Sequence, residues 1–163
     1  MPRESPFSPS AAAPEPRRLP PLLRRAWYAL NQVFRQRIAH LAITPDQFSI
    51  LRWLSEGDPA GLTQRTLTDL MASDPNTITS TLSRMESAGL ISRQPHEKDR
   101  RAHRVKLLVK GARTFEKARR MAIDLQRTAL SSLPEERRER FLEELEAVAE
   151  ACSGALEKPL KKR

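Results

Sequence analysis

The sequence predicts a mainly α-helical chain with one small β-hairpin. Apolar residues recur at three- or four-residue spacing through most of residues 22–157, which is the period of helices that each bury one face. The segment after Gly89 instead alternates in steps of two around a run of charged residues, which is typical of two short strands joined by a polar tip.

Composition and charge set the limits of this fold. A chain of 163 residues suffices for one domain with a core. The net charge of +9 favours an anionic partner such as nucleic acid or a membrane surface. Cys152 is the single cysteine, so an intramolecular disulfide is excluded. Without an apolar run of roughly 20 residues or an apolar signal core, we expect a cytoplasmic protein with no membrane partner.

The two ends of the chain are expected to lie outside the folded domain. Seven of the thirteen prolines fall within the first 21 residues, mixed with serine and alanine. Such a segment buries too little surface to offset its ordering entropy, so residues 1–18 are expected to form a disordered, proline-rich tail. The folded domain is expected to span residues 19–158, and residues 159–163 are expected to form a short basic tail.

Cap residues followed by proline mark the starts of the helices. Thr44-Pro45 and Asp74-Pro75 each place a side chain that accepts backbone hydrogen bonds before a proline, which fits a first helical turn. Thr63 resembles a further cap and opens a short helix between these two. Pro20-Pro21 is expected in the first turn of a helix over about 20–42, and Gly89 ends the helix that begins at Pro75.

The strand candidates are residues 90–94 and 104–109, with the hairpin tip at 95–103. In the second strand Val105, Leu107 and Val109 point to one side, whereas Arg104 and Lys106 point to the other. The rest of the chain is expected to be helical, over about 110–130 and 134–157, with a break at Ser132-Leu133-Pro134.

This order of short helix, turn, helix and hairpin predicts a helix-turn-helix with a wing. In the helix after Pro75, the apolar residues Ile78, Leu82 and Met85 share one stripe. The opposite face is short and polar, and comprises Asn76, Thr77, Ser80, Ser83, Arg84 and Ser87. Short side chains let a helix approach the DNA major groove closely. An exposed Ser/Thr-rich helix without a partner is an equally good interpretation of this face alone.

The positive charge is concentrated beside this helix. Residues 84–113 hold nine Lys and Arg residues against three acidic ones, a net charge of +6. A solvated charge run normally mixes both signs. The position of this excess therefore favours contact with phosphates and the minor groove.

Several of these motifs resemble the MarR family of transcriptional regulators. Asp99-Arg100-Arg101-Ala102 followed by Val105, Leu107 and Gly111 is similar to the wing signature of that family. Residues 74–79 and 85–91 are similar to its recognition helix and the exit from it, and the resemblance covers about residues 22–157. Leu108 departs from the pattern because it takes a position where the family usually has threonine. The following helix is therefore expected to lack a hydroxyl cap, which costs about 1 kcal/mol.

The resemblance implies a winged-helix homodimer that acts as a sequence-specific transcriptional regulator, most often a repressor, on a pseudo-palindromic operator in double-stranded DNA. The DNA-binding lobe would span about residues 44–110, and the dimerisation helices would span about 20–42 and 111–157. The implied DNA-binding residues are Asn76, Thr77, Ser80 and Arg84 on the recognition helix and Lys98, Asp99, Arg100, Arg101 and Arg104 on the wing. Arg101 would enter the minor groove, and Asp99 would hold the hairpin through an arginine.

Members of the family commonly respond to a small aromatic effector bound between the DNA-binding lobe and the dimerisation helices. Trp27, Tyr28 and His40 are the candidates to line such a pocket. Because Trp27 lies on the apolar stripe of its helix, a place in the core or at a dimer interface is the more usual role for it.

Other classes of function fit less well. The three histidines, the single cysteine and the lack of a glycine-rich loop provide no nucleophile–base pair and no metal cluster, so neither an enzyme nor a cofactor or metal site is predicted. The main alternative is an architectural or non-specific DNA-binding protein, which would share the basic wing. A winged helix used for protein contact is a third interpretation, against which the charge of residues 84–113 argues.

Overall fold

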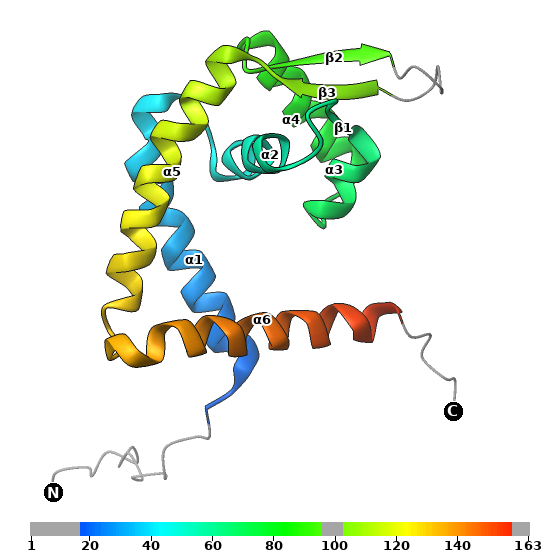
Figure 1. Cartoon of the computed structure of the whole chain (residues 1–163). Coiled ribbons are helices and arrows are strands. Elements are labelled where there is room, and N and C mark those ends of the chain that lie inside the picture. Colours follow the sequence, from blue (N-terminus) through cyan, green and yellow to red (C-terminus); the bar gives the residue numbers. More distant parts are fainter. Residues whose placement is uncertain (1–16, 96–102, 158–163) are drawn as a thin grey trace, which may run out of the picture.

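The computed structural model describes residues 17–95 and 103–157 of the chain (Figure 1). It confirms a mainly helical fold with a small sheet. The elements in chain order are α1 (Leu19–Ile38), η1 (Ala39–Leu41), α2 (Pro45–Glu56), β1 (Leu62–Thr63), α3 (Gln64–Leu70), α4 (Pro75–Ser87), β2 (Ile91–Pro95), β3 (His103–Leu107), α5 (Val109–Leu130) and α6 (Glu135–Glu157). The predicted terminal tails fall almost wholly outside the described residues.

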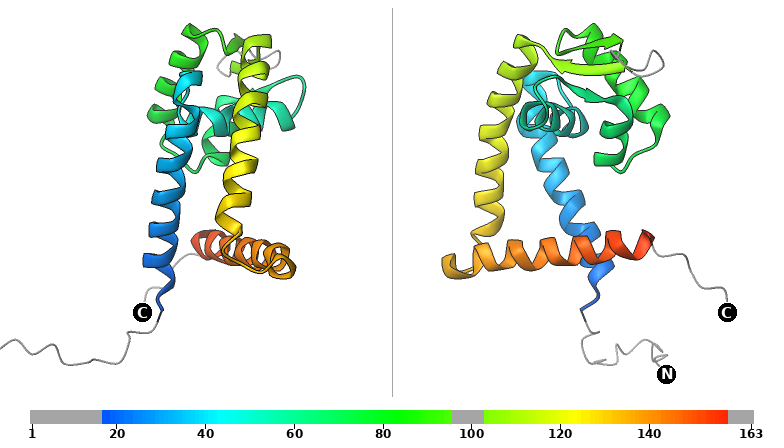
Figure 2. Two further views of the ribbon diagram at one scale, coloured as in Figure 1. Left: turned by 90° about the vertical axis from the view of Figure 1, so that its left-hand side faces the viewer. Right: turned by 45° about the vertical axis from the view of Figure 1, so that its right-hand side comes forward.

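The elements form a compact lobe and three long helices, of which α1 and α5 adjoin the lobe. The short helices α2, α3 and α4 gather around the sheet, while α1 and α5 run side by side away from it (Figure 1). At the far end of α5 the chain turns, and α6 runs crosswise to both α1 and α5 (Figure 2). The prediction of long helices at both ends of the chain is therefore confirmed.

Local hydrogen bonds fix the starts of the short helices, as predicted. Thr44 Oγ1 accepts from the Gln47 amide at 3.2 Å, and the Gln47 side chain accepts from the Thr44 amide at 2.9 Å. Asp74 Oδ1 accepts from the amides of Asn76 and Thr77 at 2.8 and 3.2 Å, which fixes the first turn of α4. At the start of α5, Leu108 makes no side-chain hydrogen bond, which confirms the missing cap.

The sheet has three antiparallel strands in the order β1-β3-β2. The strand β1 was not predicted, because two residues are too few to show alternation. The strand prediction for Val109 is wrong: β3 ends at Leu107, and Val109 opens α5 as a residue that is 69% exposed. The amide of Leu108 donates to the Leu90 carbonyl at 3.0 Å, and this last bond closes the pairing before the chain turns into the helix.

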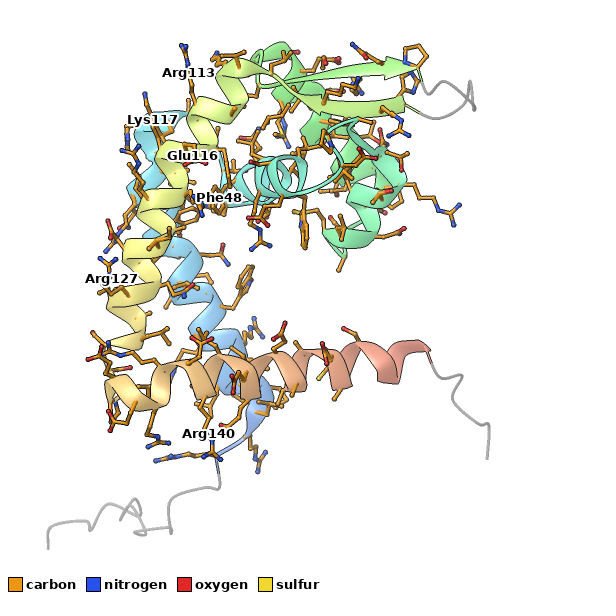
Figure 3. The ribbon with its side chains drawn as sticks, in the orientation of Figure 1. Phe48, Arg113, Glu116, Lys117, Arg127 and Arg140 are labelled. Carbon is orange, nitrogen blue, oxygen red and sulfur yellow. The ribbon has the colours of Figure 1, made fainter. Side chains whose placement is uncertain are left out.

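The core lies where α2, α4 and the sheet meet α5 and the end of α1. The predicted stripe of α4 is confirmed, because Ile78, Leu82 and Met85 are all buried. Phe48 of α2 joins the lobe to the long helices (Figure 3). Its ring centroid lies 4.9 Å from that of Phe34 in α1 and 5.6 Å from that of Phe115 in α5, which are favourable aromatic contacts.

The long helices carry apolar side chains that the protomer leaves exposed. In α1 only Phe34 and Ile38 are buried, both near its C-terminal end. Through Gly154, no residue of α6 is buried, although Phe141 and Leu145 lie on its apolar stripe. Within the described residues, no helix is both long enough and apolar enough to cross a membrane.

Candidate nucleic-acid interface

The polar face of α4 lies on the surface of the lobe. The sequence-predicted residues Asn76, Thr77, Ser80 and Arg84 are all exposed. The Ser80 hydroxyl donates to the Thr77 carbonyl at 3.2 Å, and the Ser87 hydroxyl donates to the Ser83 carbonyl at 3.0 Å. Since each hydroxyl has one proton, these oxygens present acceptor lone pairs to the outside in this arrangement.

An ion pair ties α4 to the wing strand β2. Arg93 Nε donates to Glu86 Oε2 at 2.8 Å, and the Arg93 amide donates to Glu86 Oε1 at 3.0 Å. The side-chain hydrogen bond from Arg93 is the largest cause that lowers the pKa of Glu86 below its ordinary value of 4.5, while partial burial opposes it. Arg93 thus braces the wing against α4, a role that the sequence analysis did not assign.

This brace predicts a pH-dependent term in stability. Because the pKa of Glu86 is lowered in the folded state, its contribution is present above about pH 4.5 and is lost as the pH falls through the folded-state pKa. The side chain of Glu86 is 36% exposed, so solvent screening limits the contribution to ~0.2–1 kcal/mol. Urea unfolding should find Glu86→Gln less stable than the wild type near neutral pH, by an amount that shrinks at acid pH.

The matched control is Glu143→Gln, on the exposed surface of α6. A stability difference for Glu86→Gln that stays constant across the acid range would show that the carboxylate charge contributes nothing to the brace.

Arg104 turns inward from the wing rather than away from it. Its Nη1 donates to the Gly61 carbonyl at 2.9 Å and lies 3.8 Å from Asp58 Oδ2. The chain comes close to β3 here, because Gly61 has φ +95° and a Cβ at this residue would lie 2.6 Å from the Val105 carbonyl oxygen. The sequence analysis expected Arg104 on the DNA-contacting side, but the structure gives it a bracing role between β3 and the loop before β1.

The remaining wing candidates, Lys98, Asp99, Arg100 and Arg101, lie outside the described residues. The strands that carry the tip are in place, since β2 and β3 pair from Ile91 with Leu107 through to Pro95 with His103. The two strands extend together from the lobe (Figure 1), so the ends of the tip are held at neighbouring positions.

A pocket of about 360 Å³ lies between α1, the start of α2 and α4. Trp27 and Tyr28 line it, with Arg35 from α1 and Arg84 from α4. Trp27 is not in the core of the protomer, because the residue is 65% exposed.

The third pocket candidate, His40, does not line this pocket. The lining residues of α1 share one face of that helix, whereas His40 lies beyond it in the turn η1. The sequence analysis included His40 because it expected the first helix to continue to about residue 42.

The C-terminal end of α4 is held from α5. Lys110 Nζ donates to the Ala88 carbonyl at 2.6 Å, which satisfies one of the carbonyls left free at the end of a helix. Lys110 belongs to the basic interval, but the sequence offered no sign of this capping contact.

A short helix, a turn, a second helix with a surface of short polar side chains and a wing braced against that helix define a winged helix-turn-helix protein. Residues 43–103 match the sequence model of the MarR family. The chain is 33% identical over 85 residues to the HTH-type transcriptional regulator BilQ of Clostridium symbiosum (strain WAL-14163). This match covers 52% of the chain and 59% of BilQ, so the chain spans less than two thirds of that relative.

Solved structures share the fold over most of the chain. A MarR transcriptional regulator from Methanosarcina mazei Go1 is 25% identical with a TM-score of 0.74, over 83% of this chain and 99% of that one. The transcriptional repressor CouR of Rhodococcus jostii RHA1, bound to a 23-mer DNA duplex, is 26% identical with a TM-score of 0.72, over 78% of this chain and 89% of that one. The chain is thus similar to the MarR family over residues 43–103, and it shares its fold with these solved transcriptional regulators.

Proposed function

We propose that this protein is a cytoplasmic, sequence-specific DNA-binding regulator that represses transcription. The observation that carries the proposal is the exposed face of α4, on which short polar side chains leave room for the helix to enter the major groove. The Glu86–Arg93 contact supports it, because a wing held against α4 can engage the adjacent minor groove at the same time.

The contacts divide between the two grooves. On α4, Asn76, Thr77, Ser80 and Arg84 contact the major groove. On the wing, residues 95–103 approach the minor groove and its phosphates through Lys98, Arg100 and Arg101, while Asp99 holds the hairpin. Arg104 contributes by holding β3 in position, since its guanidinium donates to Gly61.

The regulator acts as a homodimer. Residues 44–110 form the DNA-binding lobe, and residues 20–42 and 111–157 pair with a second copy across a two-fold axis. The exposed apolar side chains of α1 and α6 support this arrangement, because a helix with an unburied apolar stripe gains stability by pairing. A two-fold dimer prefers an inverted repeat whose half-site centres lie about one helical turn, ~10 bp, apart.

The pocket beside Trp27 binds a small aromatic effector. Trp27 and Tyr28 provide aromatic surface, and the guanidinium groups of Arg35 and Arg84 outnumber the carboxylate of Asp46 among its lining residues. An aromatic ligand with an anionic group therefore suits the pocket. Because Arg84 belongs to both the pocket and the DNA-contacting face of α4, an occupied pocket lowers the affinity for DNA.

Binding to DNA tests the function. The operator is first selected from a library of random duplexes, and fluorescence anisotropy then compares it with a scrambled duplex at two salt concentrations. We expect a preference of ~10³-fold or more. The Arg101→Ala variant should bind both duplexes more weakly. The slope of the logarithm of the binding constant against the logarithm of the salt concentration should fall by about one in magnitude, because the variant neutralises one phosphate fewer.

Arg137→Ala, an exposed arginine of α6, is the matched control and should leave the salt slope unchanged. Equal, steeply salt-dependent binding to both duplexes would contradict the regulator and favour the architectural alternative. Titrating aromatic carboxylates into the complex of protein and operator tests the proposed effector site. Binding of the carboxylate should release the labelled duplex and so lower its fluorescence anisotropy.

A further inference from the structure

A side chain outside the recognition helix is held at the edge of its exposed face. Gln64, the first residue of α3, donates from Nε2 to Thr79 Oγ1 of α4 at 2.6 Å. The Thr79 hydroxyl in turn donates to the Pro75 carbonyl at 2.8 Å. Its single proton is used there, so the hydroxyl can only accept from Gln64, and the amide nitrogen must face Thr79.

The other polar groups of the Gln64 amide remain available. Oε1 of Gln64 accepts no hydrogen bond from any residue that the structure describes, and no side-chain oxygen or nitrogen among those residues is buried without a partner. The oxygen and the second N–H of the amide therefore present an acceptor and a donor to the surroundings.

The position of Thr79 places this amide next to the proposed DNA-contacting surface. Thr79 follows Asn76 by three residues and precedes Ser83 by four, so the three residues are neighbours on the surface of α4. The α4 side chains near Thr79 are short, whereas Gln64 adds a longer amide from the side of α3. Gln64 thus widens the polar surface beyond the recognition helix itself.

We propose that Gln64 reads one adenine in each half-site of the operator, an inference that rests on the proposed entry of α4 into the major groove. Adenine presents a donor at N6 and an acceptor at N7 in that groove, and a glutamine amide with a free oxygen and a free N–H complements both. Thr79 is the positioning residue, because its hydroxyl selects the orientation of the amide.

The test measures base preference at each position of the operator. Wild-type protein first selects a consensus from random duplexes, and anisotropy then gives the relative Kd for every single-base substitution in one half-site. Gln64→Ala should lose about tenfold of discrimination at a single A·T pair, with the other positions unchanged. Thr79→Val should lose discrimination at the same pair, whereas Thr79→Ser, which keeps the hydroxyl, should retain it.

Gln126→Ala on the exposed surface of α5 is the matched control, and thermal unfolding by circular dichroism verifies that all variants fold. If Gln64→Ala weakens all duplexes by the same factor, or changes nothing, the inference is overturned, because the amide then reads no base. A wild-type protein that selects no consensus would overturn the proposed function, and the inference with it.

Discussion

Gly111→Ala is expected to destabilise the fold by ~3 kcal/mol, at the upper end of the range for overpacking. A Cβ at this residue would lie against the Leu90 carbonyl oxygen and 2.9 Å from Leu107 Cδ1. The Leu90 carbonyl cannot retreat freely, because it accepts the hydrogen bond from the Leu108 amide. The first turn of α5 would have to move away from the sheet, and Lys110 would leave the end of α4 with it.

Urea unfolding at fixed protein concentration measures this effect, since coupled dissociation would otherwise shift the midpoint. The matched control is Gly154→Ala in α6, where a Cβ meets nothing within 4 Å. Alanine is the better helix former, so this variant should be neutral or more stable by ~0.5–1 kcal/mol. Equal stabilities for the two variants would show that α5 does not pack on the sheet as described.

Phe141→Asp is expected to convert the proposed dimer into a monomer and to lower operator affinity by about 100-fold or more, the usual gain from bivalent binding. Phe141, Leu145 and Val148 follow one another at spacings of four and three residues along α6, and together they form one stripe. Phe141 is exposed in the protomer, so its replacement leaves the protomer core intact. A carboxylate at a paired apolar surface would be desolvated without a partner, which strongly opposes association.

Light scattering coupled to size-exclusion chromatography gives the mass of each variant, and anisotropy gives its affinity for the selected operator. Glu143→Ala, on the opposite side of α6, should remain dimeric and bind as the wild type does. If Phe141→Asp stays dimeric at micromolar concentration, the α6 stripe is not the dimer interface. If it becomes a monomer with unchanged affinity, half-sites are bound independently.

The features that the sequence predicted are local ones. Thr44 and Asp74 each accept hydrogen bonds from amides within three residues, so the cap chemistry is visible in a few letters of sequence. The stripe of α4 follows in the same way, because helical periodicity alone brings Ile78, Leu82 and Met85 to one face. The lack of a side-chain cap at the start of α5 is equally local, because it follows from the leucine at position 108 alone.

The candidate site was predictable only in part. Sequence periodicity placed Asn76 and Ser80 correctly on the exposed face of α4. Trp27 and Tyr28, which the sequence offered as pocket candidates, do line a pocket, whereas Arg84 was assigned to DNA alone. That Arg84 lines the same pocket depends on how α1, α2 and α4 pack together, and neither periodicity nor composition specifies this packing.

By itself, then, the sequence determined the helices, the caps that start α2 and α4, and the sign of the charge beside α4. Only the tertiary structure decided which charged side chains are engaged within the protein itself. Arg104 donates to the Gly61 carbonyl, 43 residues away, and Arg93 is held by Glu86. It also paired β1 with β3 and brought Gln64 to Thr79, 15 residues away. The physical reason is that a hydrogen bond between distant residues depends on the packing of whole elements, which no short window of sequence specifies.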